Sequence, residues 1–230
     1  MTSPTTPKNP PPAHLAARAQ QVHHLLMNQY GSPDWRSPYP PLNELVSTVL
    51  SQNTNDRNRD AAFEKLRSRF PTWEEVREAP ADEVIEAIRT AGLANQKGPR
   101  IQAILKHITE ERGQLELDFL RELPAVQVFE WLTDLKGVGP KTATIVMLFS
   151  LNMPAFPVDT HIYRVTGRIG LHPEKMSVEE THAYLAAQFL PESYGPAHLN
   201  IIRLGREICT ARKTNCTACP LQQICDYAQN

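Results

Sequence analysis

The sequence predicts an all-α protein. Apolar residues recur at three- to four-residue spacing in one segment after another, strand-like alternation is almost absent, and helix starts and stops are marked by capping residues and glycines. The chain has 230 residues, of which 41% are hydrophobic, and this is enough to bury a sizeable core. We therefore expect one or two compact domains built from short helices.

Two helix starts are marked by capping boxes, Thr72-x-x-Glu75 and Ser177-x-x-Glu180. In each box the hydroxyl accepts a hydrogen bond from a backbone N–H in the first turn of the helix. The carboxylate of the glutamate accepts one from the backbone N–H of the capping residue. Glycines mark the stops of three more expected helices, which cover residues 83–91, 100–112 and 160–169 and end before Gly92, Gly113 and Gly170. An N-terminal helix is expected over residues 13–29, with an apolar face formed by Leu15, Val22, Leu25 and Leu26.

A stretch with two prolines, residues 152–157, is the best candidate for a domain boundary, because proline breaks helix continuity and favours extended backbone. The N-terminal helix must bury its apolar face, and we expect it to pack on the domain after this boundary. The expected divisions are a Pro-rich disordered tail at residues 1–12, the N-terminal helix and a linker at 13–41, a helical domain at 42–152 and a C-terminal domain at 153–230.

Charge and apolar runs restrict the possible partners. A formal net charge of −1 gives no global electrostatic attraction to nucleic acid, so a nucleic-acid partner must be met by a local surface. The N-terminal stretch lacks the apolar run of a signal peptide, and the longest apolar run, residues 145–149, is far too short to span a membrane. We expect a cytoplasmic protein, nucleoid-associated if it is bacterial, that acts as a monomer without a membrane partner.

The cysteines indicate a metal site. All of them lie in the last stretch, spaced C-x6-C-x2-C-x5-C, at Cys209, Cys216, Cys219 and Cys225. Disulfides within one short segment would remove little loop-closure entropy, so a single metal site is the better interpretation. Structural zinc sites usually carry two C-x2-C pairs and this segment has one, but the spacing alone leaves both zinc and an iron-sulfur cluster open.

A glycine turn separates two helical patterns in the middle of the chain. Residues 135–143 read Leu-Lys-Gly-Val-Gly-Pro-Lys-Thr-Ala. We expect Gly137 and Gly139 to adopt positive φ and to bring backbone N–H groups close to a phosphate, while Val138 packs inward. The alternative is an ordinary tight connection between two helices.

Lys141 and Asp159 are the candidate reactive pair. Lys141 lies in the first turn of the helix after the glycines, where the helix dipole disfavours a protonated amine, and an unprotonated lysine is a nucleophile. Asp159 is within reach because the extended segment after residue 151 can double back to the start of that helix. The alternatives are a solvated lysine that contacts phosphate and an aspartate that only caps the following helix.

The glycine turn, the Val158-Asp159-Thr160-His161 segment and the cysteine spacing, in this order, resemble the endonuclease III family of bifunctional DNA glycosylases in the helix-hairpin-helix superfamily. Weaker similarity runs from about Leu42 to Cys225. The resemblance implies a helical barrel domain with the helix-hairpin-helix and a cluster domain, which flank a DNA-binding cleft. It also implies a 4Fe-4S cluster on the cysteines, Lys141 as the nucleophile and Asp159 as the catalytic aspartate.

The same resemblance assigns DNA contacts. Asn53 stands where the family usually has a glutamine that fills the gap left by a flipped base, so either Asn53 or the preceding Gln52 takes this role. Leu93 matches a leucine that wedges into the opposite strand, and Pro140 replaces a residue that is often basic. The other implied contacts are Gly137, Val138, Gly139, Thr142, His161, Arg212 and Lys213 to DNA, with Ser51, Asp56 and His161 in the base pocket.

The implied function is base excision repair of double-stranded DNA. Oxidised or ring-saturated pyrimidines would be removed, and the strand would be nicked at the abasic site through a lysine Schiff base. One alternative is a monofunctional glycosylase, such as the type that removes adenine opposite oxidised guanine, although that branch lacks the hairpin lysine and carries a further domain. The other alternative is a module that binds DNA without catalysis.

Overall fold

The computed structural model describes residue 4 and residues 6–229, and their regular secondary structure is helical. The β-type contact among them is an isolated bridge between Cys209 and Thr214. The all-α prediction is confirmed. Residues 1–3 and 5 of the expected disordered tail lie outside the described residues, and the described part of that tail contains no helix.

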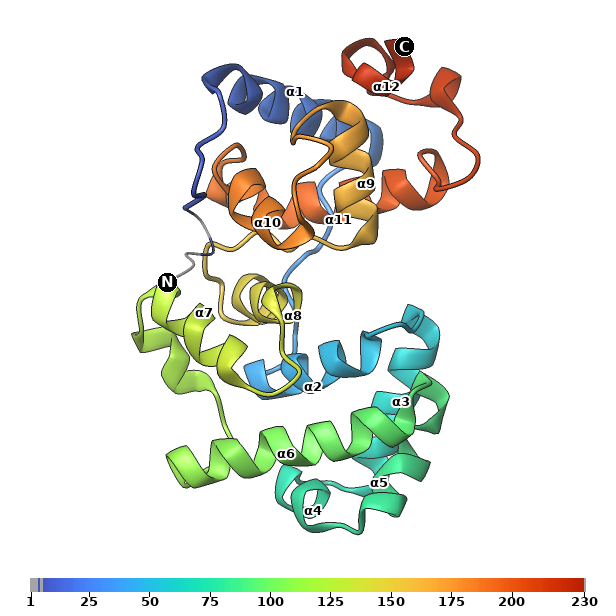
Figure 1. Cartoon of the computed structure of the whole chain (residues 1–230). Helices are drawn as coiled ribbons and strands as arrows, with labels where there is room; N and C mark the ends of the chain where they lie inside the picture. Colours follow the sequence, from blue (N-terminus) through green and yellow to red (C-terminus); the bar gives the residue numbers. More distant parts are fainter. Residues whose placement is uncertain (1–3, 5, 230) are drawn as a thin grey trace. The chain divides into compact units, whose positions relative to one another are not determined.

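The chain divides into two compact units (Figure 1). The terminal unit is formed by Met1–Arg36 and Met147–Asn230, and the central unit by Ser37–Val146. The chain passes from the central to the terminal unit between Val146 and Met147. This point comes before the proline-containing stretch, residues 152–157, that the sequence indicated as a boundary. Helix α8, Pro140–Ile145, runs directly into the π-helical segment η3, Val146–Ser150, so the chain stays helical where it passes from one unit to the other.

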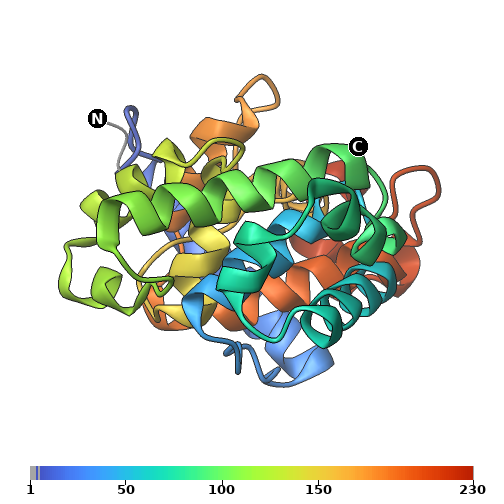
Figure 2. The same cartoon turned by 90° about the horizontal axis from the view of Figure 1, so that it is seen from below.

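The central unit is a set of short helices around one long one. Figure 2 shows the long helix α6, in green. The helices are α2 Pro41–Ser51, α3 Asp56–Arg69, α4 Trp73–Glu78, α5 Ala81–Ala87, α6 Ala94–Arg112, α7 Ala125–Asp134 and α8, with the 3-10 segments η1 Arg89–Ala91 and η2 Asp118–Glu122. The helix expected at 100–112 begins earlier, at Ala94, and runs through Pro99. A proline inside a helix normally interrupts it, which is why only the pattern after Pro99 was recognisable.

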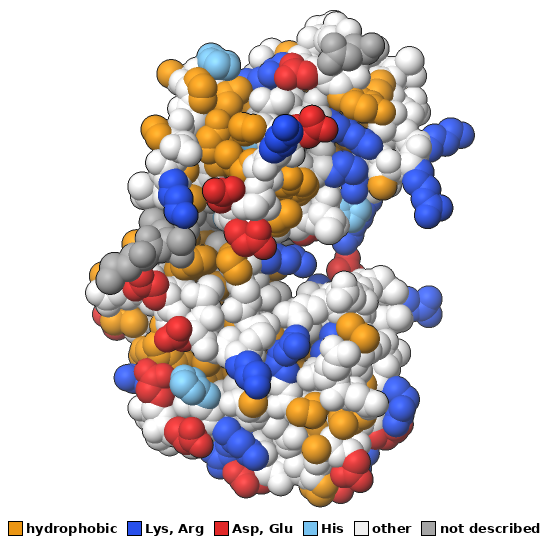
Figure 3. All heavy atoms as spheres, viewed as in Figure 1, with side chains coloured by type: hydrophobic (Ala, Val, Ile, Leu, Met, Phe, Trp, Pro, Cys, Tyr) orange, Lys and Arg blue, Asp and Glu red, His pale blue; other side chains and the backbone are white. Residues whose placement is uncertain are grey.

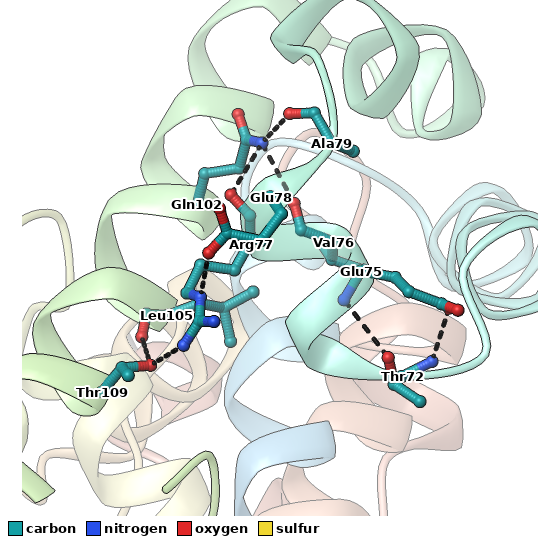
Figure 4. A network of polar contacts seen from close by, with 9 residues as sticks. All are labelled: Thr72, Glu75, Val76, Arg77, Glu78, Ala79, Gln102, Leu105 and Thr109. Carbon is teal, nitrogen blue, oxygen red and sulfur yellow. Dashed lines mark hydrogen bonds and ion pairs between the residues drawn. The ribbon is translucent and has the colours of Figure 1, made fainter. Parts of the chain in front are cut away.

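Buried polar contacts fix α4 to α6 (Figure 4). The buried Gln102 donates through its Nε2 to the carbonyl of Val76 at 3.0 Å and to that of Ala79 at 2.8 Å. Arg77 donates to the hydroxyl of Thr109 at 2.7 Å. Because α4 is only six residues long, it depends on these contacts and on its capping box rather than on its own helix propensity.

The terminal unit has its own apolar core. Its helices are α1 Ala13–Tyr30, α9 Thr160–Ile169, α10 Val178–Ala186, α11 Tyr194–Glu207 and α12 Asp226–Gln229 (Figure 1). Ala19, Val22 and Leu26 of α1 lie in this core with residues of α9 and α11. Phe156 stacks on Phe189 there, with ring centroids 5.0 Å apart. The N-terminal helix is therefore part of the unit that carries the cysteines.

The predicted local signals are present. Both capping boxes form, at Thr72 before α4 and at Ser177 before α10. Gly113 and Gly170 end α6 and α9 in the left-handed conformation, as expected. The helix expected at 83–91 is instead divided between α5 and η1.

The described helices and surfaces agree with the composition. None of the described helices combines the length and the apolar character needed to cross a membrane. Figure 3 shows Lys and Arg side chains interspersed with Asp and Glu on the face in view, which fits the formal net charge of −1. Any attraction to a polyanion must therefore come from local groups.

Candidate active site

The glycine turn between α7 and α8 is anchored from inside. The backbone N–H of Val138 donates to the carbonyl of Leu135 at 2.9 Å, and the Val138 side chain is buried. Pro140 opens α8 at its first position, where its missing N–H removes no helical hydrogen bond. The backbone of the turn is thus held in place while its outer atoms face away from the core.

The two glycines of the turn differ. Gly137 has φ 87°, a left-handed conformation that favours glycine, and an added Cβ would lie 2.4 Å from Nε of Arg100. Gly139 has φ −95°, which any residue adopts, and nothing lies within 4 Å of an added Cβ. The expectation of positive φ at both glycines is therefore wrong for Gly139, since one left-handed residue is enough to reverse the chain here.

Lys141 is the second residue of α8 and is half-buried. Within the central unit no side chain forms a hydrogen bond or an ion pair with its Nζ. The neighbouring Thr142 is buried. Thr144 donates its hydroxyl to the carbonyl of Pro140 at 2.8 Å, which fixes the first turn of the helix below the lysine.

Two loop tips of the central unit hold strained residues. Asn53, between α2 and α3, has φ 52°, and Leu93, just before α6, has φ 50°. Both conformations are uncommon for residues other than glycine, and such strain gathers at functional sites. Leu93 is also 47% exposed, although an apolar side chain gains nothing in water. Two of the residues for which the sequence implied insertion into DNA, Asn53 and Leu93, are thus held in unusual conformations.

A buried lysine connects these two loops. Lys97 of α6 is only 1% exposed. Its Nζ donates to the carbonyl of Leu50 at 2.7 Å, to the carbonyl of Ala91 at 2.9 Å and to the hydroxyl of Thr54 at 3.0 Å. Thr54 in turn donates to the carbonyl of Ala91. Sequence reasoning missed Lys97, because a lysine near a helix start is normally solvated.

Arg100, one turn further along α6, contacts the glycine turn. It donates from Nη1 to Oε1 of Gln52 at 2.8 Å, and Gln52 donates from Nε2 to the carbonyl of Gly137 at 3.3 Å. Gln52 is therefore held against the hairpin, while Asn53 beside it is exposed. The other predicted pocket residues of the central unit are engaged locally, since Ser51 and Asp56 contact the Thr48 carbonyl and Arg59 respectively.

Asp159 lies in the terminal unit and caps α9. Its Oδ1 accepts a hydrogen bond from the backbone N–H of Ile162 at 2.7 Å. The segment before it is fixed by two buried histidines, as the Val158 N–H donates to the ring of His182 at 3.2 Å and the ring of His198 lies 3.0 Å from the Pro157 carbonyl. The capping role left open by the sequence is thus present, and it leaves the second carboxylate oxygen for other work.

His161 follows Asp159 on α9 and is half-buried. Its Nδ1 lies 3.1 Å from Nη2 of Arg164, which also donates from Nε to the carbonyl of Cys209 at 3.2 Å. The helix that starts at Asp159 is therefore linked by side-chain contacts to the segment that carries the cysteines.

The four cysteines come together in the terminal unit. They line one cavity of about 270 Å³, part of which is open to solvent, together with Ile208, Thr214, Asn215, Tyr227 and Ala228. Burial raises the pKa of the Cys219 and Cys225 thiols. Ionised thiolates here would need a positive partner, and a metal centre supplies one. As the side chains stand, no group of three or more His, Cys, Asp or Glu residues in the described part of the chain encloses a single metal ion.

Arg168 of α9 forms hydrogen bonds with the first part of this segment. It donates from Nη1 to Sγ of Cys209 at 3.2 Å and to the Thr210 carbonyl at 2.8 Å, and from Nη2 to the Ala211 carbonyl at 3.2 Å. The following residues, Arg212 and Lys213, are exposed at the tip of the loop. Blue side chains project from the side of the unit where this loop lies in Figure 1 (Figure 3).

Comparison with known proteins identifies the family. A profile of the HhH-GPD superfamily of base excision DNA repair proteins matches residues 46–189. Endonuclease III of Thermotoga maritima is 35% identical over 188 residues, which cover 81% of this chain and 83% of that protein. The chain belongs to the HhH-GPD superfamily. The predicted resemblance is confirmed, and so is the fold, because a solved non-covalent endonuclease III–DNA complex matches this HhH-GPD protein with a TM-score of 0.80 at 26% identity, covering 93% and 96% of the two chains.

A plant relative is more similar over a shorter range. A protein of Arabidopsis thaliana that is named as a DNA glycosylase is 40% identical over 144 residues, which cover 63% of this HhH-GPD chain and 49% of that protein. The chain thus spans about half the length of that relative.

Proposed function

We propose that the protein is a DNA glycosylase with abasic-site lyase activity, which removes oxidised or ring-saturated pyrimidines from double-stranded DNA. One observation carries the proposal: Lys141 stands at the second position of α8, directly after a rigid glycine turn whose outer backbone is open. Neither the monofunctional type nor the non-catalytic module is favoured, because the endonuclease III relatives match most of the chain and its hairpin carries this lysine.

The reaction proceeds through covalent catalysis by Lys141. A damaged nucleotide is flipped out of the duplex, and the lysine Nζ attacks C1′ of its sugar while the bond from C1′ to the base breaks. The base leaves with the electron pair of that bond and takes up a proton. The sugar ring opens, and the amine and C1′ form a Schiff base. Removal of a proton from C2′ then expels the 3′ phosphate, which nicks the strand, and water releases the enzyme.

Asp159 stabilises positive charge and accepts a proton in this reaction. Its carboxylate stabilises the positive charge that develops on the sugar and accepts a proton from the attacking amine. The hydrogen bond from Ile162 fixes Oδ1 at 2.7 Å, so the direction of the carboxylate is set by the helix that it caps. The same geometry lets one residue serve the helix and the chemistry.

The strained loop tips fill the space that base flipping leaves. Asn53 is exposed, whereas Gln52 is bound to Arg100 and Gly137, so we assign the gap-filling role to Asn53. Leu93 is the wedge in the opposite strand. The exposed Arg212 and Lys213 supply phosphate contacts.

We propose that the cysteine segment binds a 4Fe-4S cluster. The residues that line the cavity include four thiols and no carboxylate, and Cys209, Cys216, Cys219 and Cys225 would be the ligands. When bound, the cluster would provide structural cross-linking and the positive charge that makes the thiolates stable. It would fix the loop of Arg212 and Lys213 in one conformation, while the chemistry on DNA stays with Lys141 and Asp159.

Borohydride trapping tests the proposed function. The wild-type protein is incubated with a duplex that contains thymine glycol, and sodium borohydride is added to reduce any Schiff base. With borohydride we expect a covalent protein–DNA adduct. In parallel samples without borohydride we expect a nicked strand. Base release without an adduct would instead show a monofunctional glycosylase, and binding without base release would show a non-catalytic module.

The two hairpin glycines are expected to respond differently to alanine. Gly137→Ala places a side chain at φ 87° and against Arg100, so we expect a loss of about 1–3 kcal/mol in unfolding free energy. Gly139→Ala adds a methyl group in open space, so stability should change by less than about 0.5 kcal/mol. The methyl group of the Gly139→Ala variant should obstruct the close approach of a phosphate, so we expect this variant to bind an abasic-analogue duplex more weakly. Thermal unfolding and fluorescence anisotropy measure the two effects, and equal stability losses would contradict this account.

Removal of one cysteine is expected to release the cluster. Cys216→Ala leaves three thiols, so bound iron and the brown absorbance should be lost together and thermal stability should fall. The matched control is Thr217→Ala, the next residue, which is exposed and should retain the iron of the wild-type protein. Metal analysis decides the identity of the centre, because zinc in place of iron in the purified wild-type protein would contradict the cluster.

A further inference from the structure

We propose that Lys97 and Arg100 are positioning residues, which lock the Asn53 loop, the Leu93 loop and the glycine turn into one preformed surface for entering the DNA stack. The inference rests on the proposed function and goes beyond it, because neither residue contacts the reacting atoms. Both lie on α6, and each connects segments that are distant in the sequence.

The burial of Lys97 is the first argument. Taking an ammonium group out of water has a large cost unless its donors are satisfied, and here three donors meet three acceptors at 2.7–3.0 Å. The acceptors come from the end of α2, at Leu50, from the Asn53 loop, at Thr54, and from the end of η1 beside the Leu93 loop, at Ala91. A methionine of similar length would fill the same space without the cost of burying a charge, so packing alone does not explain a lysine at this position. The hydrogen bonds of the Lys97 ammonium group instead fix the distance between the two strained loop tips.

The position of Arg100 is the second argument. Its side chain occupies the space that a Cβ at Gly137 would need, and its Nη1 holds Gln52, which in turn donates to the Gly137 carbonyl. The glycine turn is thereby connected to the Asn53 loop. Together the two cations join three segments of the central unit, in addition to the direct contacts of Thr54 with Ala91 and of Gln52 with Gly137.

Preformed loops bind DNA with less loss of conformational entropy than loops that must become ordered on contact. Asn53 and Leu93 adopt left-handed conformations that are uncommon for residues other than glycine, and such conformations persist only when surrounding contacts enforce them. Backbone hydrogen bonds close each of the two turns, and the side chains of Lys97 and Arg100 add the contacts that connect the turns to the surrounding segments. The cations should therefore matter most for a substrate whose base stack must be entered.

Two substrates separate insertion from chemistry. The first is a duplex with an abasic site opposite 2-aminopurine, whose fluorescence rises when it is unstacked. The second is a single strand with the same abasic site, which has no stack to enter but still forms the Schiff base with Lys141. We expect Lys97→Met to slow borohydride trapping on the duplex by about 10- to 100-fold and to reduce the 2-aminopurine signal. Trapping on the single strand should stay within about twofold of wild type.

Further variants keep the test decisive. Lys106→Met makes the same change at an exposed position of α6 and should leave both substrates unaffected. Thr54→Val removes one acceptor of Lys97 while keeping the side-chain shape, and should reproduce a smaller duplex-selective loss even if Lys97→Met folds poorly. Arg100→Gln should likewise give a smaller duplex-selective loss, because it removes the hydrogen bond that holds Gln52. Equal losses on both substrates, or unchanged trapping on the duplex, would overturn the proposal, whereas failure of the wild-type protein on both substrates would overturn the proposed function itself.

The charge of Lys97 adds a pH readout. Burial, with a contribution from the neighbouring charge of Arg100, lowers the pKa of Lys97 from 10.5 to about 8. The other groups against its Nζ are uncharged: two carbonyls and a hydroxyl. Deprotonation above pH 8 removes one donor from the network, so duplex trapping should fall relative to single-strand trapping as the pH rises through 8. This ratio should not depend on pH in Lys97→Met, and the same pH dependence in the variant would contradict the assignment.

Discussion

Lys141→Gln is expected to abolish the borohydride adduct and to lower base excision and strand nicking by roughly 10⁴-fold or more, the range seen when a covalent nucleophile is removed. Glutamine keeps the length and polarity of the side chain but lacks an amine that can form a Schiff base. Because Lys141 is half-buried and forms no pair within the central unit, the change should leave folding intact. Single-turnover kinetics and trapping on the thymine-glycol duplex measure the effect.

Lys136→Gln provides the matched control for this experiment. Lys136 lies in the same hairpin, is exposed and loses the same charge. It should weaken DNA binding slightly and in a salt-dependent manner, with excision and trapping otherwise preserved. If the two variants had equal activity, Lys141 would be one more phosphate contact and the covalent mechanism would be wrong.

Local signals made most of the helices predictable. A capping box such as Thr72-x-x-Glu75, or a glycine after a periodic segment such as Gly170 after α9, depends only on neighbouring residues and on backbone geometry. Predictions failed where tertiary contacts override local preference. Helix α6 continues through Pro99, and its start is set by Leu93 in a left-handed conformation, which no propensity favours.

The candidate site was predictable as far as it consists of motifs. Lys141, Asp159 and the cysteines lie in short segments with a fixed spacing, so the sequence shows them directly. Lys97 and Arg168 lie outside such motifs, and their importance comes from burial and from partners remote in the chain, 47 residues away for the Leu50 carbonyl and 41 for Cys209. Only the folded structure shows that these cations are used internally rather than solvated.

The opposite case is Gln52 and Asn53, which the sequence could not distinguish. Both are amides in one loop, and either has the chemistry to pair with an unpaired base. The structure separates them by their contacts, since Gln52 is bound to Arg100 and Asn53 is exposed. The proposed assignment of the gap-filling role to Asn53 therefore rests on tertiary hydrogen bonds.

Asp159→Asn is expected to separate the two roles of this residue. Asparagine caps a helix about as well as aspartate, so the hydrogen bond from Ile162 and the stability should be kept. The negative charge is lost, and with it the stabilisation of a cationic sugar and the acceptance of a proton, so single-turnover excision should fall by about 10²- to 10⁴-fold. Binding to a duplex with an uncleavable abasic analogue should change little.

Asp159→Ala removes the cap as well as the charge. It should show the same loss of excision as Asp159→Asn and an additional loss of about 1 kcal/mol in unfolding free energy. The two variants thus share one effect and differ in the other, which thermal unfolding and excision kinetics measure independently. Full excision activity in Asp159→Asn would reduce this aspartate to a structural cap, because the only property that the variant lacks is the charge.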